Sequence, residues 1–118
     1  MKYLCMGYHD ETQWATMDEK ERAALVEENM AYLAQLRKSG HFLDGIALQP
    51  TTTAATLRFE AGQMAVTDGP FAETKEQLGG AMVLDATDLN HAIQLMSQLP
   101  CMRVNGSLEI RPLNEELS

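Results

Sequence analysis

Residues 3–8, Tyr3-Leu4-Cys5-Met6-Gly7-Tyr8, decide the fold of this chain. The run has the length of a β-strand, and neither of its two alternating faces carries a charge. Because successive side chains of a strand point to opposite faces of a sheet, a strand that is apolar on both faces needs cover on both. Helices of the same chain supply one cover. We expect a second subunit to supply the other.

A helix and a second strand are predicted next. Thr16 and Glu19 have the spacing of a capping box, and the helix that they open runs to about Lys38 and stops before Gly40. Residues 41–48 are predicted to form the second strand. The helix carries an apolar stripe made of Leu25, Val26, Met30, Tyr32, Leu33 and Leu36.

The middle of the chain is predicted to be a β-hairpin. Residues 56–59 and 64–67 form its strands, and Gly62 in the turn between them can take a positive φ. The dense turn signal Asp68-Gly69-Pro70-Phe71 follows. Residues 72–78 are predicted to form one helical turn.

The last third of the chain is predicted to have a strand, a helix and a strand. The first of these strands covers residues 81–84. The helix begins at Thr87 or Asp88 and ends at Pro100, which cannot continue it. Residues 107–111 form the closing strand.

The complete order is β-α-β-hairpin-β-α-β. It predicts an α+β, ferredoxin-like sandwich with both helices on one face of a mostly antiparallel sheet. The opposite face stays bare in a monomer, so we expect a homodimer. No linker, repeat or low-complexity tract divides the sequence. Residues 1–118 are therefore expected to form one domain, with a polar tail at residues 113–118.

The composition excludes several classes of partner. The 118 residues include 9 basic and 17 acidic side chains, and the net charge of −8 argues against binding to nucleic acid or to an anionic membrane. The apolar start is too short for a signal peptide, and Cys5 and Cys101 form no disulfide framework, so we expect a reduced, cytoplasmic protein. Because His9, His41 and His91 lie far apart, we expect no metal and no cofactor.

Residues 68–80, Asp68-Gly69-Pro70-Phe71-Ala72-Glu73-Thr74-Lys75-Glu76-Gln77-Leu78-Gly79-Gly80, resemble the signature of the DGPF proteins, a branch of the YCII-related superfamily. Residues 1–4, 45–50 and 107–112 resemble the opening strand, the end of the second strand and the closing strand of that family. The resemblance implies a ferredoxin-like subunit that dimerises sheet to sheet into an α+β barrel. It also implies a bacterial protein, since the members are mostly small bacterial proteins of unassigned activity, some of them encoded beside sigma factors of the extracytoplasmic-function type.

Certain YCII relatives act on small aromatic or lactone-like molecules and use a His–Asp pair. The position of that histidine in the first helix is Asn29 in this chain. An amide cannot act as a general base near neutral pH, so we do not extend the His–Asp chemistry to this protein. Asn29 has two interpretations. In the first, its amide lies at the edge of the apolar stripe or is bonded to backbone in the core. In the second, it is a polar group directed at a cavity.

Five candidate ligand-binding residues belong to the signature run and to the closing strand. Asp68 either caps backbone N–H groups in an Asx-turn or faces a ligand at the mouth of a barrel. Glu73 and Lys75 lie in a charged run that is either a solvated face or, through Lys75, a contact to an anionic ligand. Strand alternation places Glu109 and Arg111 away from the helices, as an ion pair or as a site for a ligand anion.

We predict that Asp68 and Arg111 serve one site at the edge of the dimer barrel. Either the pair locks the loop, or Arg111 is free to take a ligand anion. His9 ends the first strand near this mouth and is the last candidate, with a structural or surface role as its alternative.

These observations favour a homodimeric small-molecule-binding protein or enzyme with a pocket at the dimer barrel. The alternative is a non-catalytic regulatory or interaction module, linked to sigma-factor-dependent transcription through protein contacts. The sequence names neither a ligand nor a reaction.

Overall fold

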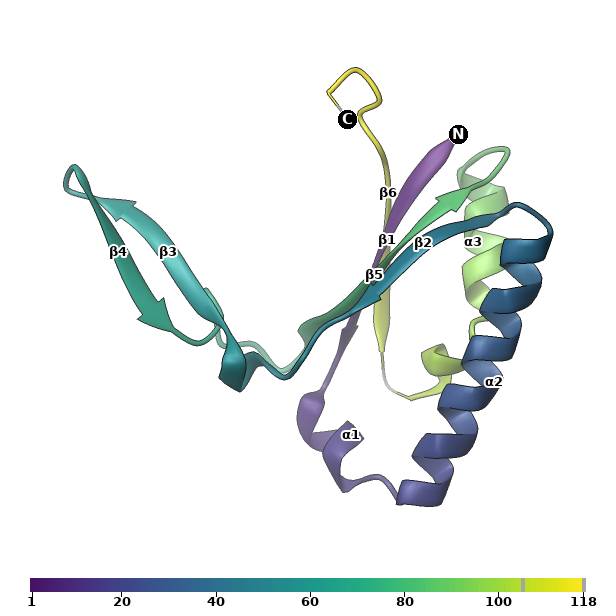
Figure 1. The fold of residues 1–118 in the computed structure, drawn as a ribbon, viewed down its shortest axis with the longest axis horizontal. Coiled ribbons are helices and arrows are strands. Elements are labelled where there is room, and N and C mark those ends of the chain that lie inside the picture. Colours follow the sequence, from purple (N-terminus) through teal and green to yellow (C-terminus); the bar gives the residue numbers. More distant parts are fainter. Residues whose placement is uncertain (105, 118) are drawn as a thin grey trace.

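A computed structural model describes residues 1–104 and 106–117. Four strands form an antiparallel sheet in the order β2-β5-β1-β6, in which β5 and β1 are the central pair (Figure 1). The bounds of these strands are Lys2–His9 for β1, Phe42–Ala47 for β2, Gln77–Asp85 for β5 and Ser107–Pro112 for β6.

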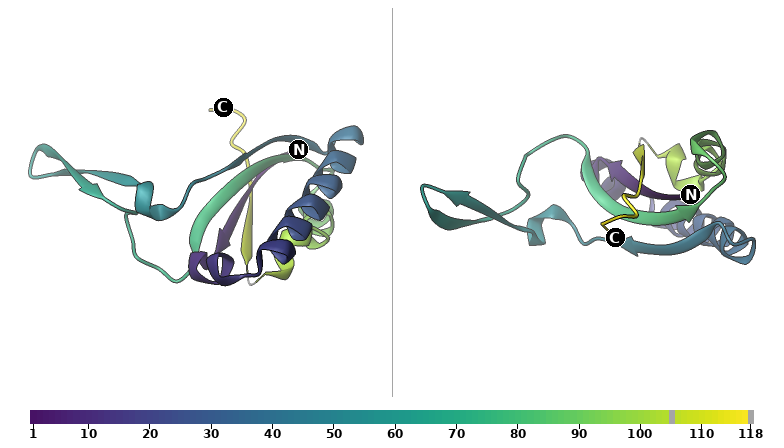
Figure 2. Two further views of the ribbon diagram at one scale, coloured as in Figure 1. Left: turned by 60° about the horizontal axis from the view of Figure 1, so that its bottom comes forward. Right: turned by 90° about the horizontal axis from the view of Figure 1, so that it is seen from above.

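Two helices, α2 (Glu19–Lys38) and α3 (Leu89–Ser97), cover one face of this sheet (Figures 1 and 2). The core lies between the two layers, where Tyr3, Cys5 and Leu84 are fully buried. Each chain segment between two sheet strands places its helix on the same side, which is the ferredoxin-like α+β arrangement predicted from the sequence. Three short helices complete the structure, namely α1 (Glu11–Thr16), η1 (Thr51–Thr53) and η2 (Pro100–Arg103).

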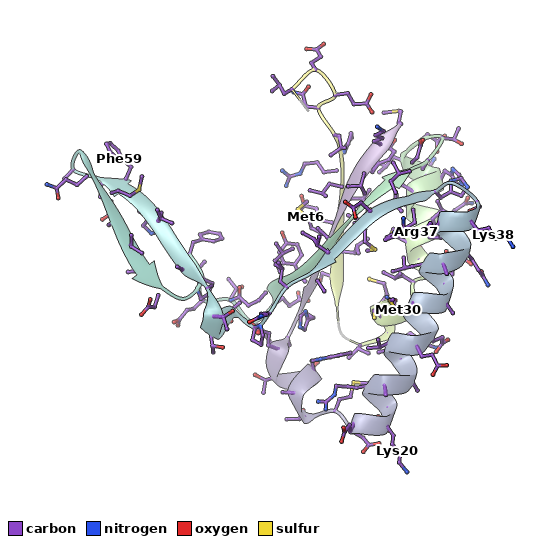
Figure 3. The ribbon with its side chains drawn as sticks, viewed as in Figure 1. Met6, Lys20, Met30, Arg37, Lys38 and Phe59 are labelled. Carbon is purple, nitrogen blue, oxygen red and sulfur yellow. The ribbon has the colours of Figure 1, made fainter. Side chains whose placement is uncertain are left out.

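The opposite face of the sheet is open, and Met6 points from it away from the helices (Figure 3). The strand register places side chains of β1, β5 and β2 together on this open face. Leu4, Met6, Tyr8, Ala81 and Val83 are half-buried, whereas Ile46 is 63% exposed and the charged Asp44, which pairs with Val83, is also exposed. The apolar members of the open face are Leu4, Met6, Tyr8, Ala81, Val83 and Ile46.

The predicted hairpin forms a separate two-stranded sheet, β3 (Ala55–Glu60) and β4 (Gln63–Asp68), which we call the arm. The arm projects from the end of the main sheet on the side away from α2 and α3 (Figures 1 and 2). It raises the radius of gyration to 16.2 Å, against roughly 13 Å for a compact chain of this length. The turn residues Ala61 and Gly62 have φ angles of 52° and 77°, so the positive φ predicted for Gly62 is confirmed.

Helix α2 ends at Lys38 as predicted, but it begins later than the sequence suggested. Its N-cap is Asp18, and the Thr16 hydroxyl donates to the Gln13 carbonyl instead of capping α2. The capping-box prediction was therefore wrong, because α1 takes up residues 11–16. Val26 and Met30 were assigned to the buried stripe, yet they are 44% and 63% exposed.

The helical turn predicted for residues 72–78 is absent, and β5 begins at Gln77. The Gln77 side-chain amide donates to the carbonyls of Ala72 and Thr74, each at 3.1 Å. Those carbonyls are thereby occupied by a side chain, and the segment stays irregular. Gly80 lies inside β5, where a Cβ would be 2.7 Å from the Ile46 carbonyl oxygen.

The described residues end in a turn that lies beyond β6. The Leu113 amide donates to the Lys2 carbonyl, and the Leu117 amide donates to the Asn114 carbonyl. The predicted polar tail at residues 113–118 includes Ser118, which lies outside the described residues. In the described part of the chain, no helix has both the length and the apolar character needed to cross a membrane.

Candidate functional site

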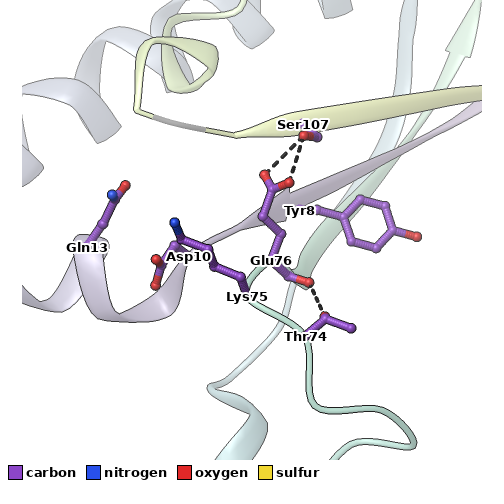
Figure 4. Close-up of a pocket in the computed structure, with 7 residues that line it drawn as sticks. All are labelled: Tyr8, Asp10, Gln13, Thr74, Lys75, Glu76 and Ser107. Carbon is purple, nitrogen blue, oxygen red and sulfur yellow. Dashed lines mark hydrogen bonds between the residues drawn. The ribbon is translucent and has the colours of Figure 1, made fainter.

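An open groove of about 780 Å³ lies at the end of the main sheet, where β1 ends and β5 and β6 begin (Figure 4). Four separate segments build it: the end of β1 with the following residue, α1, the loop before β5, and the start of β6. The groove is therefore a product of the topology. Its lining consists of Tyr8, Asp10, Gln13, Thr74, Lys75, Glu76 and Ser107.

Glu76 is the best-fixed polar side chain of the groove. Both of its carboxylate oxygens accept from the Ser107 hydroxyl at 3.0 Å, and its backbone carbonyl accepts from the Thr74 hydroxyl at 2.6 Å (Figure 4). These bonds join the loop before β5 to β6 across the end of the sheet. One hydroxyl proton cannot satisfy both oxygens at once, so the carboxylate keeps acceptor capacity for a ligand.

Asp10 and Lys75 supply opposite charges on the other side of the groove. The Asp10 carboxylate is the N-cap of α1 and accepts from the Thr12 amide at 2.9 Å, which fixes its orientation. The Lys75 side chain extends toward the end of the groove formed by Asp10 and Gln13 (Figure 4). The groove thus offers one ammonium donor and two carboxylate acceptors, whereas the Tyr8 hydroxyl points away from it and donates to the Met6 sulfur at 4.0 Å (Figure 4).

The signature segment contributes to the groove through only some of the predicted residues. Lys75 lines it, whereas Glu73 is exposed in the loop two residues earlier. Asp68 ends β4 in the arm and is exposed, and no hydrogen bond joins its carboxylate to another described residue. The Asx-turn proposed for Asp68 is therefore not formed. Gly69 has a φ of 92°, a conformation that glycine adopts without strain.

Arg111 does not meet Asp68 within the subunit. The Arg111 Nε donates to the Glu109 carboxylate at 2.9 Å, and its Nη2 bonds the same oxygen. Both side chains stand on the open face of β6, as strand alternation predicts, while Leu108 and Ile110 pack into the core. The Arg111 side chain is 68% exposed in the subunit, where the two residues form a surface ion pair. The role of Arg111 toward a ligand anion in a dimer barrel stays a prediction.

His9 lies beside the groove and does not line it. Its ring makes an edge-to-face contact with Trp14, with the ring centroids 6.5 Å apart. The ring also occupies the place that a Cβ at Gly79 would fill. These contacts support the structural interpretation of His9, because Gly79 has no side chain and leaves room for the imidazole ring.

Asn29, which stands at the position of the histidine that certain relatives use in a His–Asp pair, makes a structural contact. Its side-chain oxygen accepts from the Cys101 amide at 3.0 Å and so joins α2 to η2. This bond supports the first interpretation of Asn29, in which its amide is bonded to backbone, over a polar group directed at a cavity. Asn29 is remote in sequence and in contacts from the groove residues.

The two cysteines are poor nucleophiles at neutral pH. Burial raises the pKa of the Cys5 thiol to about 11. Burial also raises the pKa of Cys101, partly offset by the positive charge of Arg103. Because the thiolate is the reactive form, both side chains act as small apolar groups. The described residues contain no group of three or more His, Cys, Asp or Glu side chains placed to hold a metal ion.

Most of the groove was not predicted from the sequence. Lys75 and its neighbour Glu76 stood in the charged run, but the remaining lining residues were not candidates. Position was an available signal for three of the missed residues, because Tyr8 and Asp10 lie at the end of β1 and Ser107 begins β6, whereas Gln13 in α1 and Thr74 in the loop before β5 carry no such signal. Those missed residues are Tyr8, Asp10, Gln13, Thr74 and Ser107.

Comparison with known proteins identifies the family. The model of the YCII-related domain matches residues 1–116. This chain belongs to the YCII-related family. An uncharacterised protein of Rhizobium meliloti (strain 1021) is 37% identical to this YCII-related protein over 114 residues, which are 96% of this chain and 92% of the relative. The resemblance inferred from residues 68–80 is therefore confirmed at the level of the superfamily.

Proposed function

We propose that this YCII-related protein is a homodimer that binds a small polar molecule in the groove at the end of its sheet. The observation that carries the proposal is the convergence of Lys75, Glu76, Asp10 and Ser107 from three separate segments onto one groove. Polar groups that converge in a concave site are the usual mark of a ligand-binding site.

The groove favours a ligand that carries both hydrogen-bond donors and an acidic or strongly accepting group. Donors of the ligand suit the carboxylates of Glu76 and Asp10, and an anionic group suits the ammonium of Lys75. The hydroxyl of Ser107 already holds Glu76 in place, which lowers the entropy cost of binding.

The open face of the sheet supports the homodimer. Its apolar side chains from β1, β5 and β2 form a continuous surface, and Glu109 and Arg111 border that surface on β6. Burial of apolar surface is the main driving force of association. An apolar centre with a charged border has the composition of a protein–protein interface.

A thermal-shift screen of small polar metabolites tests the proposal. We expect at least one compound to raise the melting temperature of the wild type, since binding to the native state stabilises it. Glu76→Gln keeps the size of the side chain and removes its charge, so the same compound should no longer shift the melting temperature. Glu73→Gln is the matched control, because Glu73 lies in the same loop but outside the groove.

Two outcomes contradict the proposal. A screen without any stabilising compound favours the second candidate, a non-catalytic interaction module, for which the exposed arm is the supporting observation. Its proposed role in sigma-factor-dependent transcription rests on the family resemblance. An equal shift in the wild type and in Glu76→Gln places the ligand elsewhere on the protein.

A further inference from the structure

We propose that the arm, β3 and β4, is an interaction surface for a second copy of this chain. The apolar face of the arm packs on that second copy. The inference rests on the homodimer of the proposed function and adds a second contact to it. Each subunit extends its own arm along its partner.

The arm is amphipathic. Leu57 pairs with Val66 and Phe59 pairs with Met64, so these four side chains share one face. Their exposed fractions are 62% for Leu57, 66% for Val66, 71% for Phe59 and 58% for Met64. The other face carries only polar and small side chains, in the pairs Thr56–Thr67, Arg58–Ala65 and Glu60–Gln63.

Such a face is not stable in water by itself. An isolated two-stranded hairpin is at best marginal, and three strands or a packing partner are normally needed. The four large side chains leave an apolar patch on the order of several hundred Å², at the upper end of what monomeric proteins expose. Within the subunit, β3 and β4 pair only with each other. The arm therefore needs cover from outside its own chain.

The direction of the arm favours a second copy as this cover. The arm leaves the main sheet on the side opposite α2 and α3, which is also the side of the open face and of Met6 (Figures 2 and 3). A partner that covers the open face therefore lies beside the arm. Twofold symmetry places two arms and two open faces in the same assembly. A stable interface buries roughly 1,200–2,000 Å² in total, and the two arms add their apolar faces to those of the two sheets.

The charge of the arm agrees with this assignment. Although the whole chain carries a net charge of −8, the arm has only Arg58, Glu60 and Asp68 as charged residues, and its apolar face carries one of them, Asp68, at the base of the arm opposite Ala55. With a net charge of 1 − 2 = −1, the arm adds little repulsion when it approaches an acidic copy. An anionic membrane would require a cluster of basic residues, and the arm holds a single one.

The base of the arm is held in place, so the arm is preset for docking. The Glu11 carboxylate accepts from the Thr51 amide at 3.0 Å and from the Thr51 hydroxyl at 2.5 Å, which joins η1 to α1. Within the arm, the Thr56 hydroxyl of β3 donates at 2.8 Å to the carbonyl of Gly69, which directly follows β4. A preset arm loses less entropy on binding than a flexible one.

Sedimentation equilibrium of matched arm variants tests the inference. Leu57→Asp places a charge on the apolar face, and Ala65→Asp places the same charge on the opposite face of the same hairpin. We expect wild type and Ala65→Asp to form dimers, and Leu57→Asp to weaken dimerisation on the order of a hundredfold, since an unpaired buried charge is strongly unfavourable. Circular dichroism verifies folding, and Met64→Ser serves as a milder second variant.

The outcomes separate this inference from the proposed function. A monomeric wild type overturns both the homodimer and the docking of the arm. If all variants dimerise equally well, the homodimer stands and the inference is wrong. Binding of wild type, but not of Leu57→Asp, to phosphatidylglycerol vesicles without dimerisation assigns the arm to a membrane and also overturns it. Ligand binding in the groove is measured separately and depends on neither result.

Discussion

The central pair β1–β5 and the arm pair β3–β4 are both antiparallel, and yet they differ in burial. Tyr3 and Leu84, which face each other across β1 and β5, are 1% and 0% exposed, whereas Leu57 and Val66 across the arm are 62% and 66% exposed. The difference lies in the layers above each pair. Helices of the same chain cover β1 and β5, and the arm has no such layer. The local sequence pattern thus predicts that a segment is a strand. Which helix or subunit covers its apolar face is decided by the whole assembly.

The largest expected effect comes from truncating one apolar residue in each region. Leu84→Ala should lower the free energy of unfolding by about 2–5 kcal/mol, because it leaves a cavity in a closed core. Val66→Ala, measured at a low concentration where copies are separate, should change it by less than about 0.5 kcal/mol. Urea unfolding followed by circular dichroism measures both values. Similar losses for the two variants would show that the arm is packed within its own subunit.

The buried thiol of Cys5 makes the stability of the central pair depend on pH. Its pKa rises from 9.0 to about 11 on folding, so between these values the unfolded thiol is ionised while the folded one keeps its proton. Unfolding then releases a proton, and the free energy of unfolding should fall by about 2–3 kcal/mol as the pH rises through this window.

Cys5→Ala is the control for this pH dependence. The variant lacks the titrating group and should show a flatter decline between pH 9 and pH 11. The decline that remains includes Tyr32, whose pKa is also raised by burial. An equal decline in wild type and variant would mean that water reaches Cys5 in the folded protein.

A matched pair of glycines tests how tightly β5 packs against β2. A Cβ at Gly80 would lie 2.7 Å from the Ile46 carbonyl oxygen, while one at Gly7, its partner across the sheet, would meet only the Gly80 carbonyl at 3.8 Å. Gly80→Ala should therefore lower the free energy of unfolding by about 1–3 kcal/mol. Gly7→Ala should be nearly neutral, and equal losses in thermal unfolding would contradict the close contact between β2 and β5.

The smallest effect is expected at the ion pair on the open face. Arg111→Gln should lower the free energy of unfolding by less than about 1 kcal/mol when copies are separate, since exposed ion pairs contribute little. This value is below the 1–3 kcal/mol expected if Arg111 locked the signature loop. A loss that grows with protein concentration would show that a second copy buries the pair.

The fold could be predicted from the sequence because its signals are local. Alternation in residues 107–111 set the two faces of β6 correctly, and the residues around Gly40 marked the end of α2. The errors arose where a distant or competing contact decides the backbone. Gln77 occupies the carbonyls of the expected helical turn, and α1 takes Thr16 away from the expected cap.

The groove could be predicted only in part, for a similar reason. Lys75 and Glu76 belong to a recognisable signature, whereas Ser107 and Asp10 become neighbours only when β1, β5 and β6 align at one end. Asp68 and Arg111 do not meet within the subunit, because the hairpin that ends at Asp68 extends away from the main sheet as the arm (Figure 1). Their common site at the edge of a dimer barrel stays a prediction.

Hydrogen exchange of the wild-type protein at two concentrations tests most directly whether the arm depends on a second copy. We compare backbone amides of β3 and β4 with those of β1, at about 1 µM and about 100 µM protein. We expect β1 to be protected at both concentrations and the arm to become protected, on the order of tenfold, only at the higher one. An arm that exchanges equally fast at both concentrations, while the protein is dimeric, would rule out that a second copy covers it.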